Sequence, residues 1–294
     1  MLPYIELFTA YPVALYITTL ILGLLVGSFL NVVIYRLPIM LERQWKQECS
    51  EYLKVEGSQP EESKTFNLIT PRSACPHCGH QITALENIPV LSFLLQKGKC
   101  RSCGGKISVQ YPLIELLTGV MSVGVVIYFG YSLQALAALF FTWSLIALAI
   151  IDLKTTLLPD NITLPLIWAG LILNLQFGLF TDATSSLYGA VVGYLSLWTL
   201  YHVFRVLTGK EGMGYGDFKL FAAFGAWFGW QYLPLIIILS SFAGAVIGIG
   251  LILFRGRDRN IPIPFGPYLA IAGWIALIWG QEITQAYLSS AGIH

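Results

Sequence analysis

Long apolar runs constrain this chain more than any other feature of its sequence. A helix needs about 20 apolar residues to cross the hydrocarbon core of a bilayer. Hydrophobic residues make up 56% of the chain and charged residues only 11%, whereas soluble proteins carry about 25% charged residues. The sequence therefore predicts an all-α polytopic membrane protein with about eight transmembrane helices, at residues 11–35, 113–130, 132–151, 162–180, 186–207, 218–231, 234–254 and 265–288.

The distribution of charge predicts the topology. The 17 basic and 16 acidic residues leave a net charge of +1, which does not favour binding to nucleic acid. If all eight segments cross, every Lys and Arg falls on one side, and cytoplasmic loops carry the Lys/Arg excess. The shortest pair of segments, residues 218–254, then needs a turn at Gly229–Pro234. We therefore expect eight crossings with both termini on the outer side.

One polar region interrupts the apolar pattern. Residues 39–112 hold four of the five cysteines and form the sizeable soluble part of the chain. We predict three parts: a first transmembrane helix within residues 1–38, a cytoplasmic domain at 39–112, and a seven-helix membrane domain at 113–294. Residues 42–65 are rich in Glu, Lys, Gln and Ser, which indicates a surface-exposed or amphipathic approach to the soluble domain.

Two CxxC pairs in the soluble domain predict a metal centre formed by Cys75, Cys78, Cys100 and Cys103. Two such knuckles supply the tetrahedral set of thiolates that binds Zn²⁺, and four thiolates leave no open position for catalytic water. The alternative is a pair of disulfides, which do not persist in a reducing cytosol. We expect a structural zinc, with Cys49 outside the site.

Two aspartates at the ends of apolar segments predict a second site. Asp152 closes the third segment and Asp217 opens the sixth, so the topology places both at the cytoplasmic face. Two carboxylates that share a site do not both ionise readily, which allows one to act as a base toward water while the other keeps its proton. The helix dipole favours Asp217 as the base and Asp152 as the protonated partner.

Neighbouring residues offer an alternative to that site. Each aspartate can instead be an ordinary helix-end residue paired with Lys154 or Lys219. Gly214 and Gly216, which precede Asp217, allow backbone or substrate to come close to its carboxylate. Asp160 is expected to be the N-cap of the fourth segment.

These motifs, in this order, resemble the bacterial type IV prepilin peptidases, also called leader peptidase/N-methyltransferases. GxGD alone is also found in presenilin-like proteases, but together with the cysteine pairs it is specific. The resemblance covers nearly the whole chain and rests on residues 27–38, the four-cysteine block with residues 87–92, residues 108–119, Asp152 with residues 157–160, residues 214–217 and residues 264–270.

The resemblance implies an aspartic endopeptidase of the bacterial inner membrane, with Asp152 and Asp217 as its catalytic pair. Its substrates are prepilins and pseudopilins of type IV pili and type II secretion, cleaved after a glycine that ends a short basic leader. The new N-terminal residue is then methylated with S-adenosylmethionine as the methyl donor.

The family ties methyl transfer to the cysteine domain, so Asn87, Gly98 and Lys99 are candidates for that activity. Glu115, just inside the second segment, either contacts a substrate amine or methyl donor or pairs with a basic residue. The turn at Ile261–Pro267 either lines the cleft or simply starts a helix.

Two other classes of protein fit parts of the sequence. A transporter or channel with a zinc-stabilised cytosolic domain would use the aspartates to bind cations or protons. It predicts acidic residues near mid-bilayer and broken helices in repeated halves, whereas both aspartates lie at one edge. A zinc-dependent assembly scaffold is the third interpretation.

Overall fold

The computed structural model describes residues 11–53, 65–255 and 263–290. Within these ranges the regular elements are helices, and two isolated β-bridges occur outside them. The predicted all-α class is therefore confirmed. The chain divides into two compact units, Met1–Tyr131 and Ser132–His294. Each unit is described by itself.

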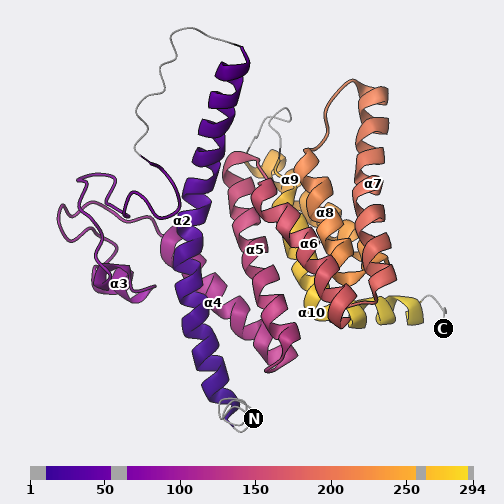
Figure 1. Cartoon of the computed structure of the whole chain (residues 1–294), viewed down its shortest axis with the longest axis horizontal. Coiled ribbons are helices and arrows are strands. Elements are labelled where there is room, and N and C mark those ends of the chain that lie inside the picture. The colour runs from indigo at the N-terminus through magenta and orange to yellow at the C-terminus, as the bar shows by residue number, and fades with distance from the viewer. Residues whose placement is uncertain (1–10, 54–64, 256–262, 291–294) are drawn as a thin grey trace. The chain divides into compact units, whose positions relative to one another are not determined.

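The first long helix of unit 1, α2 (Pro12–Tyr52), is much longer than a membrane crossing requires (Figure 1). Its 41 residues make a rod of about 60 Å, against about 30 Å for the hydrocarbon core. The helix continues through Pro38, so the predicted domain boundary at residue 38 falls inside it. The polar extension is stabilised by side-chain pairs one turn apart, among them Lys46 with Glu42 at 2.7 Å.

The second long helix of unit 1, α4 (Gln110–Phe129), packs along α2 with its chain running in the opposite direction. A Cβ atom added to Gly23 would lie 2.8 Å from the Cα of Gly119, and one added to Gly27 would lie 2.7 Å from the Cα of Glu115. Steps of four residues in α2 therefore meet steps of four in α4, and the small side chains let the two backbones touch.

Residues 65–109, which we call the cysteine module, join α2 to α4. They contain a short 3-10 turn, η1 (Leu85–Asn87), and the five-residue helix α3 (Leu91–Leu95). Ala74 pairs with Gln81 and Lys99 with Lys106 in the two bridges, one in each cysteine knuckle.

The described part of unit 2 contains six helices, and each of the remaining predicted segments overlaps one of them. They are α5 (Leu133–Thr155), α6 (Asp160–Phe177), α7 (Ala183–Thr208), α8 (Tyr215–Phe228), α9 (Leu233–Arg255) and α10 (Gly266–Ser290). A 3-10 turn, η2 (Trp230–Tyr232), separates α8 from α9. The turn expected between those two segments is confirmed.

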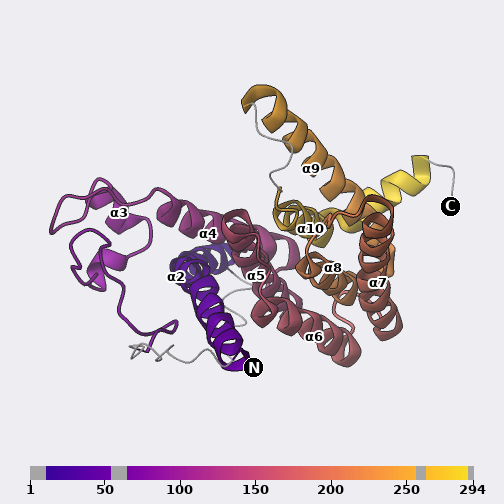
Figure 2. The same cartoon turned by 90° about the horizontal axis from the view of Figure 1, so that it is seen from above.

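Helix α8 lies at the centre of unit 2, between α6, α7 and α10 (Figure 2). Its residues from Phe218 to Phe228 are almost all buried. The rings of Phe224, Trp227 and Phe228 pack against Phe141 of α5. This packing of apolar side chains holds the C-terminal part of α8, the helix whose first turn carries Asp217.

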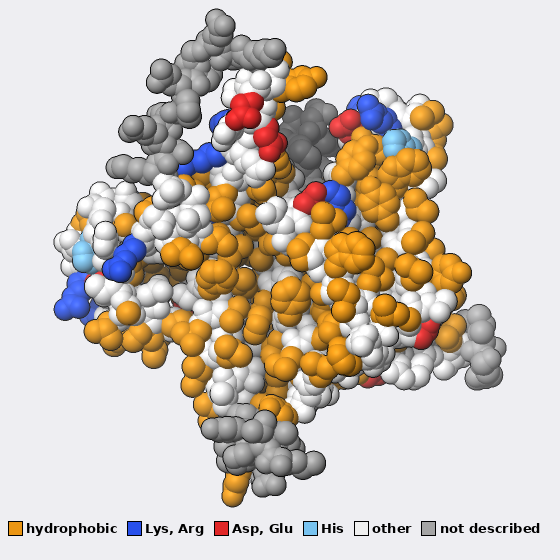
Figure 3. Space-filling view, viewed as in Figure 1, with side chains coloured by type: hydrophobic (Ala, Val, Ile, Leu, Met, Phe, Trp, Pro, Cys, Tyr) orange, Lys and Arg blue, Asp and Glu red, His pale blue; other side chains and the backbone are white. Residues whose placement is uncertain are grey.

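Among the described residues, five helical segments are long and apolar enough to cross a membrane: α2, α4, α5, α7 and the segment Trp230–Leu251. Their outward faces carry large apolar side chains that are not covered by protein, such as Leu187, Val191 and Trp198 on α7. Hydrophobic side chains cover much of the face seen in Figure 3. Exposed apolar surface on this scale indicates lipid contact. Helices α6, α8 and α10 are not among the five, and α8, with 14 residues, spans only about 21 Å.

Candidate active site and metal centre

The ends of two helices bring Asp152 and Asp217 to one cavity in unit 2. Asp152 lies in the last turn of α5, which ends at Thr155, and Asp217 is the third residue of α8. The side chains are 5% and 7% exposed. The two residues are 65 positions apart in the chain, and their expected convergence is what the structure shows.

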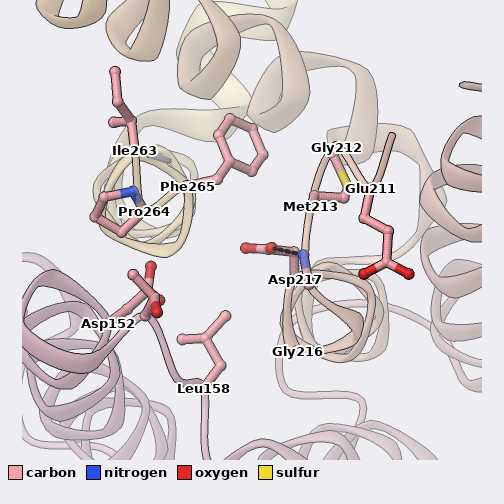
Figure 4. A pocket seen from close by; sticks show the side chains of 12 residues that line it. Asp152, Leu158, Glu211, Gly212, Met213, Gly216, Asp217, Ile263, Pro264 and Phe265 are labelled. Carbon is pink, nitrogen blue, oxygen red and sulfur yellow. Dashed lines mark hydrogen bonds between the residues drawn. The ribbon is translucent and has the colours of Figure 1, made fainter. Parts of the chain in front are cut away.

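Backbone N–H groups hold both carboxylates in place. The N–H of Gly266, at the start of α10, donates to Oδ2 of Asp152 at 2.9 Å. The N–H of Gly214 donates to Oδ2 of Asp217 at 3.2 Å. The carboxylates approach the cavity from opposite sides (Figure 4). Oδ1 of Asp217 is buried and has no hydrogen-bond partner among the residues described.

The cavity has a volume of about 270 Å³ and three walls around the aspartates. One wall follows α5, a second precedes α8, and a third precedes α10. Glu211 contributes to the second wall, but its carboxylate points away from the space between the aspartates (Figure 4). Apart from the aspartates, the lining residues are Thr156, Leu158, Glu211, Gly212, Met213, Gly214, Gly216, Ile263, Pro264 and Phe265.

The alternative interpretation, in which each aspartate is an ordinary helix-end residue, paired it with Lys154 or Lys219. Lys219 does not pair with Asp217. Its Nζ lies 2.6 and 2.7 Å from the two carboxylate oxygens of Asp160. In the described part of the chain, neither cavity aspartate forms an ion pair with a basic side chain. We also expected Asp160 to be the N-cap of α6, and this was wrong. Pro159 is the N-cap, and Asp160 is the first helical residue.

The two glycines of the Gly214–Asp217 segment differ in what they permit. A Cβ at Gly216 would lie 2.6 Å from the Cβ of Leu158, whereas one at Gly214 would meet nothing closer than 3.8 Å. Gly216 therefore allows the start of α8 to pack against the loop after α5. Gly214 contributes its backbone N–H.

The four predicted cysteines meet in the cysteine module. The Sγ atoms of Cys75, Cys78, Cys100 and Cys103 all lie within 4.8 Å of one another, and those of Cys75 and Cys103 are 3.9 Å apart. Four Zn–S bonds of about 2.3 Å in a tetrahedron place the sulfurs about 3.8 Å apart. The donor set and its spacing therefore fit a zinc ion, and the predicted tetracysteine cluster is confirmed.

Backbone groups of the knuckles favour the thiolate form that metals bind. N–H groups of His77 and Cys78 lower the pKa of the Cys75 thiol to about 7. Those of Cys103 and Ser102 also lower the pKa of Cys100.

The histidine beside the first knuckle has a partner other than the metal. His80 lies 3.2 Å from a carboxylate oxygen of Glu86. Hydrogen bonds from the backbone and hydroxyl of Thr83 and from His80 lower the pKa of Glu86 to about 2. Cys49 lies outside the cluster, exposed on α2.

Comparison with known proteins indicates the family to which this chain belongs. A model of the bacterial peptidase A24 N-terminal domain matches residues 21–129, and one of the type IV leader peptidase family matches residues 139–249. Proteins named prepilin leader peptidase/N-methyltransferase align over nearly their whole length. The one from Aeromonas salmonicida is 55% identical over 97% of this chain and 98% of its own. Those from Pseudomonas aeruginosa and Legionella pneumophila are 53% and 45% identical, over 99% and 95% of this chain and 99% and 96% of their own.

The chain belongs to the type IV leader peptidase family. No solved structure gives a significant match to it. The N-terminal family model covers α4 and the cysteine module, and the second model covers both cavity aspartates.

The residues suggested for methyl transfer all lie in the cysteine module of this leader peptidase. Asn87 ends η1. Gly98 has a φ of +67° and its N–H donates to the carbonyl of Phe93 at 2.9 Å, which closes the turn after α3. Lys99 follows in the bridge to Lys106. Glu115 binds no basic side chain among the residues described; its carboxylate accepts the N–H of Val90 at 2.8 Å.

Two features of the leader peptidase cavity were missed from the sequence. Gly266 supplies the backbone donor to Asp152, and Met213 and Leu158 supply apolar walls. The turn before α10 did carry a signal, because a proline-rich start of a helix presents free N–H groups. Ile263–Phe265 of that turn lines the cavity, while its residues 261 and 262 lie outside the described ranges.

Proposed function

We propose that this protein cleaves the basic leader from type IV prepilins and type II secretion pseudopilins and then N-methylates the new N-terminal residue. Relatives that carry both activities in their name align along nearly all of this chain. The observation that carries the peptidase proposal is the pair of buried aspartates that face one cavity, with no cation paired to either in the described residues.

Cleavage needs a water molecule and two carboxyl groups. One carboxylate accepts a proton from water, whose oxygen attacks the carbonyl carbon of the scissile peptide bond. The other carboxyl donates a proton to the leaving nitrogen as the C–N bond breaks, giving a free acid and a free amine. The unpartnered Oδ1 of Asp217 is an acceptor suited to that water.

The helix ends suggest which aspartate takes which role. Asp217 lies in the first turn of α8, where the dipole stabilises negative charge, and Asp152 in the last turn of α5, where it favours the neutral acid. We assign Asp217 as the base and Asp152 as the protonated partner. Enclosure of Asp217 works against its charge, so a site-resolved titration is the test: ionisation of Asp152 before Asp217 reverses the assignment.

The cysteine module is proposed as the part associated with methyl transfer. Zinc held by Cys75, Cys78, Cys100 and Cys103 supplies folding energy to a segment with little core. S-adenosylmethionine is the proposed donor: its methyl group passes from sulfur to the α-amine nitrogen, the sulfur keeps the electron pair, and the amine loses a proton. Asn87, Gly98 and Lys99 are the proposed residues of that region.

The placement in the membrane is likewise a proposal. Eight crossings put all 17 Lys and Arg on one side, so both termini face outward and both sites face the cytoplasm of a bacterial inner membrane. Functionally we divide the chain into residues 1–38, 39–112 and 113–294. A transporter role is not favoured, because the relatives are named as peptidases.

The decisive experiment incubates the purified chain with a prepilin and S-adenosylmethionine. Mass spectrometry reads leader loss and methyl gain separately. Asp152→Asn and Asp217→Asn should abolish cleavage and leave methylation of a pre-cleaved pilin intact. Asp182→Asn is the matched control, since Asp182 only caps α7. Wild-type cleavage by either cavity variant would refute the peptidase proposal.

A further inference from the structure

Two buried charged side chains of unit 1 bind the cysteine module instead of an opposite charge. Arg36 of α2 is 7% exposed and Glu115 of α4 is 8% exposed. Burying a charge is costly unless hydrogen bonds compensate for lost water. Neither residue forms an ion pair within the described ranges, so their hydrogen-bond partners indicate their role.

Arg36 binds the loop that leads into the first cysteine knuckle. Its Nη1 donates to the carbonyl of Asn67 at 2.9 Å and its Nη2 to the carbonyl of Pro71 at 2.6 Å. The loop is closed on itself, because Oδ1 of Asn67 accepts the N–H groups of Ile69 and Thr70. The rigid fork of one arginine thus fixes the chain four residues before Cys75.

Glu115 binds the segment that leads into the second knuckle. Its carboxylate accepts the N–H of Val90 at 2.8 Å. Val90 is the N-cap of α3 with a φ of +60°, a strained conformation for a β-branched residue that only its surroundings can maintain. From α3 the chain turns through Gly98 directly to Cys100.

Each knuckle is therefore approached by a segment that one membrane helix anchors. The metal draws the two knuckles together, but it does not determine where they lie on α2 and α4. We propose that Arg36 and Glu115 are positioning residues that hold the cysteine module at one place on the α2–α4 pair, and that methyl transfer depends on this placement whereas cleavage does not. The inference rests on the proposed assignment of methyl transfer to the module.

The central test compares Glu115→Leu with Glu115→Gln. Leucine removes the acceptor, while glutamine keeps an amide oxygen for the N–H of Val90. A misplacement of about 1 Å costs about a hundredfold in rate, so Glu115→Leu should methylate about a hundredfold more slowly, with normal cleavage, bound zinc and faster amide exchange across α3. Glu115→Gln should recover most of the methylation. The exposed Glu42 is the matched control, and Glu42→Leu should change neither activity.

Arg36 provides an independent test at the other anchor. Arg36→Met should slow methylation and retain cleavage. Arg36→Lys keeps one donor group instead of the two of the guanidinium fork, so its methylation rate should lie between those of the wild type and Arg36→Met.

Three results would overturn the inference. These are methylation at the wild-type rate in Glu115→Leu, equal losses in the Leu and Gln variants, or loss of zinc in Glu115→Leu, since the carboxylate would then fold the module and not place it. Failure of the proposed function looks different: Cys100→Ser would then keep methylation, whatever the Glu115 variants do.

Discussion

The two glycines before Asp217 determine where its carboxylate lies in the cavity. Asp217 is held through the N–H of Gly214, and its helix approaches the loop after α5 only because Gly216 lacks a Cβ. The GxGD segment therefore contains two glycines with separate physical tasks. One supplies a hydrogen-bond donor, which any residue except proline supplies, and the other supplies space.

We predict that Gly216→Ala and Gly214→Ala have different effects on cleavage. An added methyl at Gly216 would lie 2.6 Å from the Cβ of Leu158, and the resulting shift of Asp217 should slow cleavage about a hundredfold. The methyl at Gly214 meets nothing closer than 3.8 Å, so this variant should cleave within a fewfold of wild type. Rates on one prepilin measure both; equal rates for the two variants would contradict the geometry.

The helices of unit 2 hold the site through very close contacts. A Cβ at Gly225 of α8 would lie 2.0 Å from the carbonyl oxygen of Gly189 in α7, and one at Gly189 would lie 2.3 Å from that of Gly225. Backbone meets backbone here, so no side-chain rotation can make room. This contact fixes α7 against the helix that carries Asp217.

We expect Gly189→Ala to destabilise unit 2 by about 1–3 kcal/mol, as overpacking of a close contact does. The midpoint of thermal unfolding in detergent should fall, and cleavage should fall with it. Gly250 of α9 has open space around it, and Gly250→Ala is the control, since alanine favours a helix by about 1 kcal/mol over glycine. A midpoint for Gly189→Ala equal to that of Gly250→Ala would show that α7 and α8 separate easily.

Elements with a strong local signal could be predicted from the sequence. Each apolar segment predicted from length overlaps a helix of the described residues, although only five of these helical segments are long and apolar enough to cross a membrane. The CxxC spacing located the tetracysteine cluster. The extension of α2 beyond residue 38 was missed because polar pairs, and not apolar length, stabilise it. The partner of Lys219 was also missed, since Asp160 and Asp217 are equally suitable in sequence and only the packing of α6 on α8 selects one.

At the scale of the whole molecule, the two sites belong to different compact units. The cysteines lie in unit 1, and every residue that lines the aspartate cavity lies in unit 2. The proposed methyl transfer and the proposed cleavage are therefore assigned to different compact units of the chain. We therefore expect methylation and cleavage to be lost under different conditions.

Removal of zinc should separate the two activities. A strong chelator is expected to unfold the cysteine module, because metal binding supplies its folding energy, and to abolish methylation while cleavage continues. Metal content, methyl gain and leader loss measured on one sample test this. Return of methylation when zinc is added back is the control, and a parallel loss of cleavage would contradict the independence of the units.

The unpartnered Oδ1 of Asp217 has a pharmacological consequence. A buried acceptor that no described protein group satisfies gains a hydrogen bond from any ligand that brings a hydroxyl to it. Peptide analogues that replace the scissile amide with a tetrahedral carbon bearing a hydroxyl should therefore bind this cavity far more tightly than the same analogues without that hydroxyl.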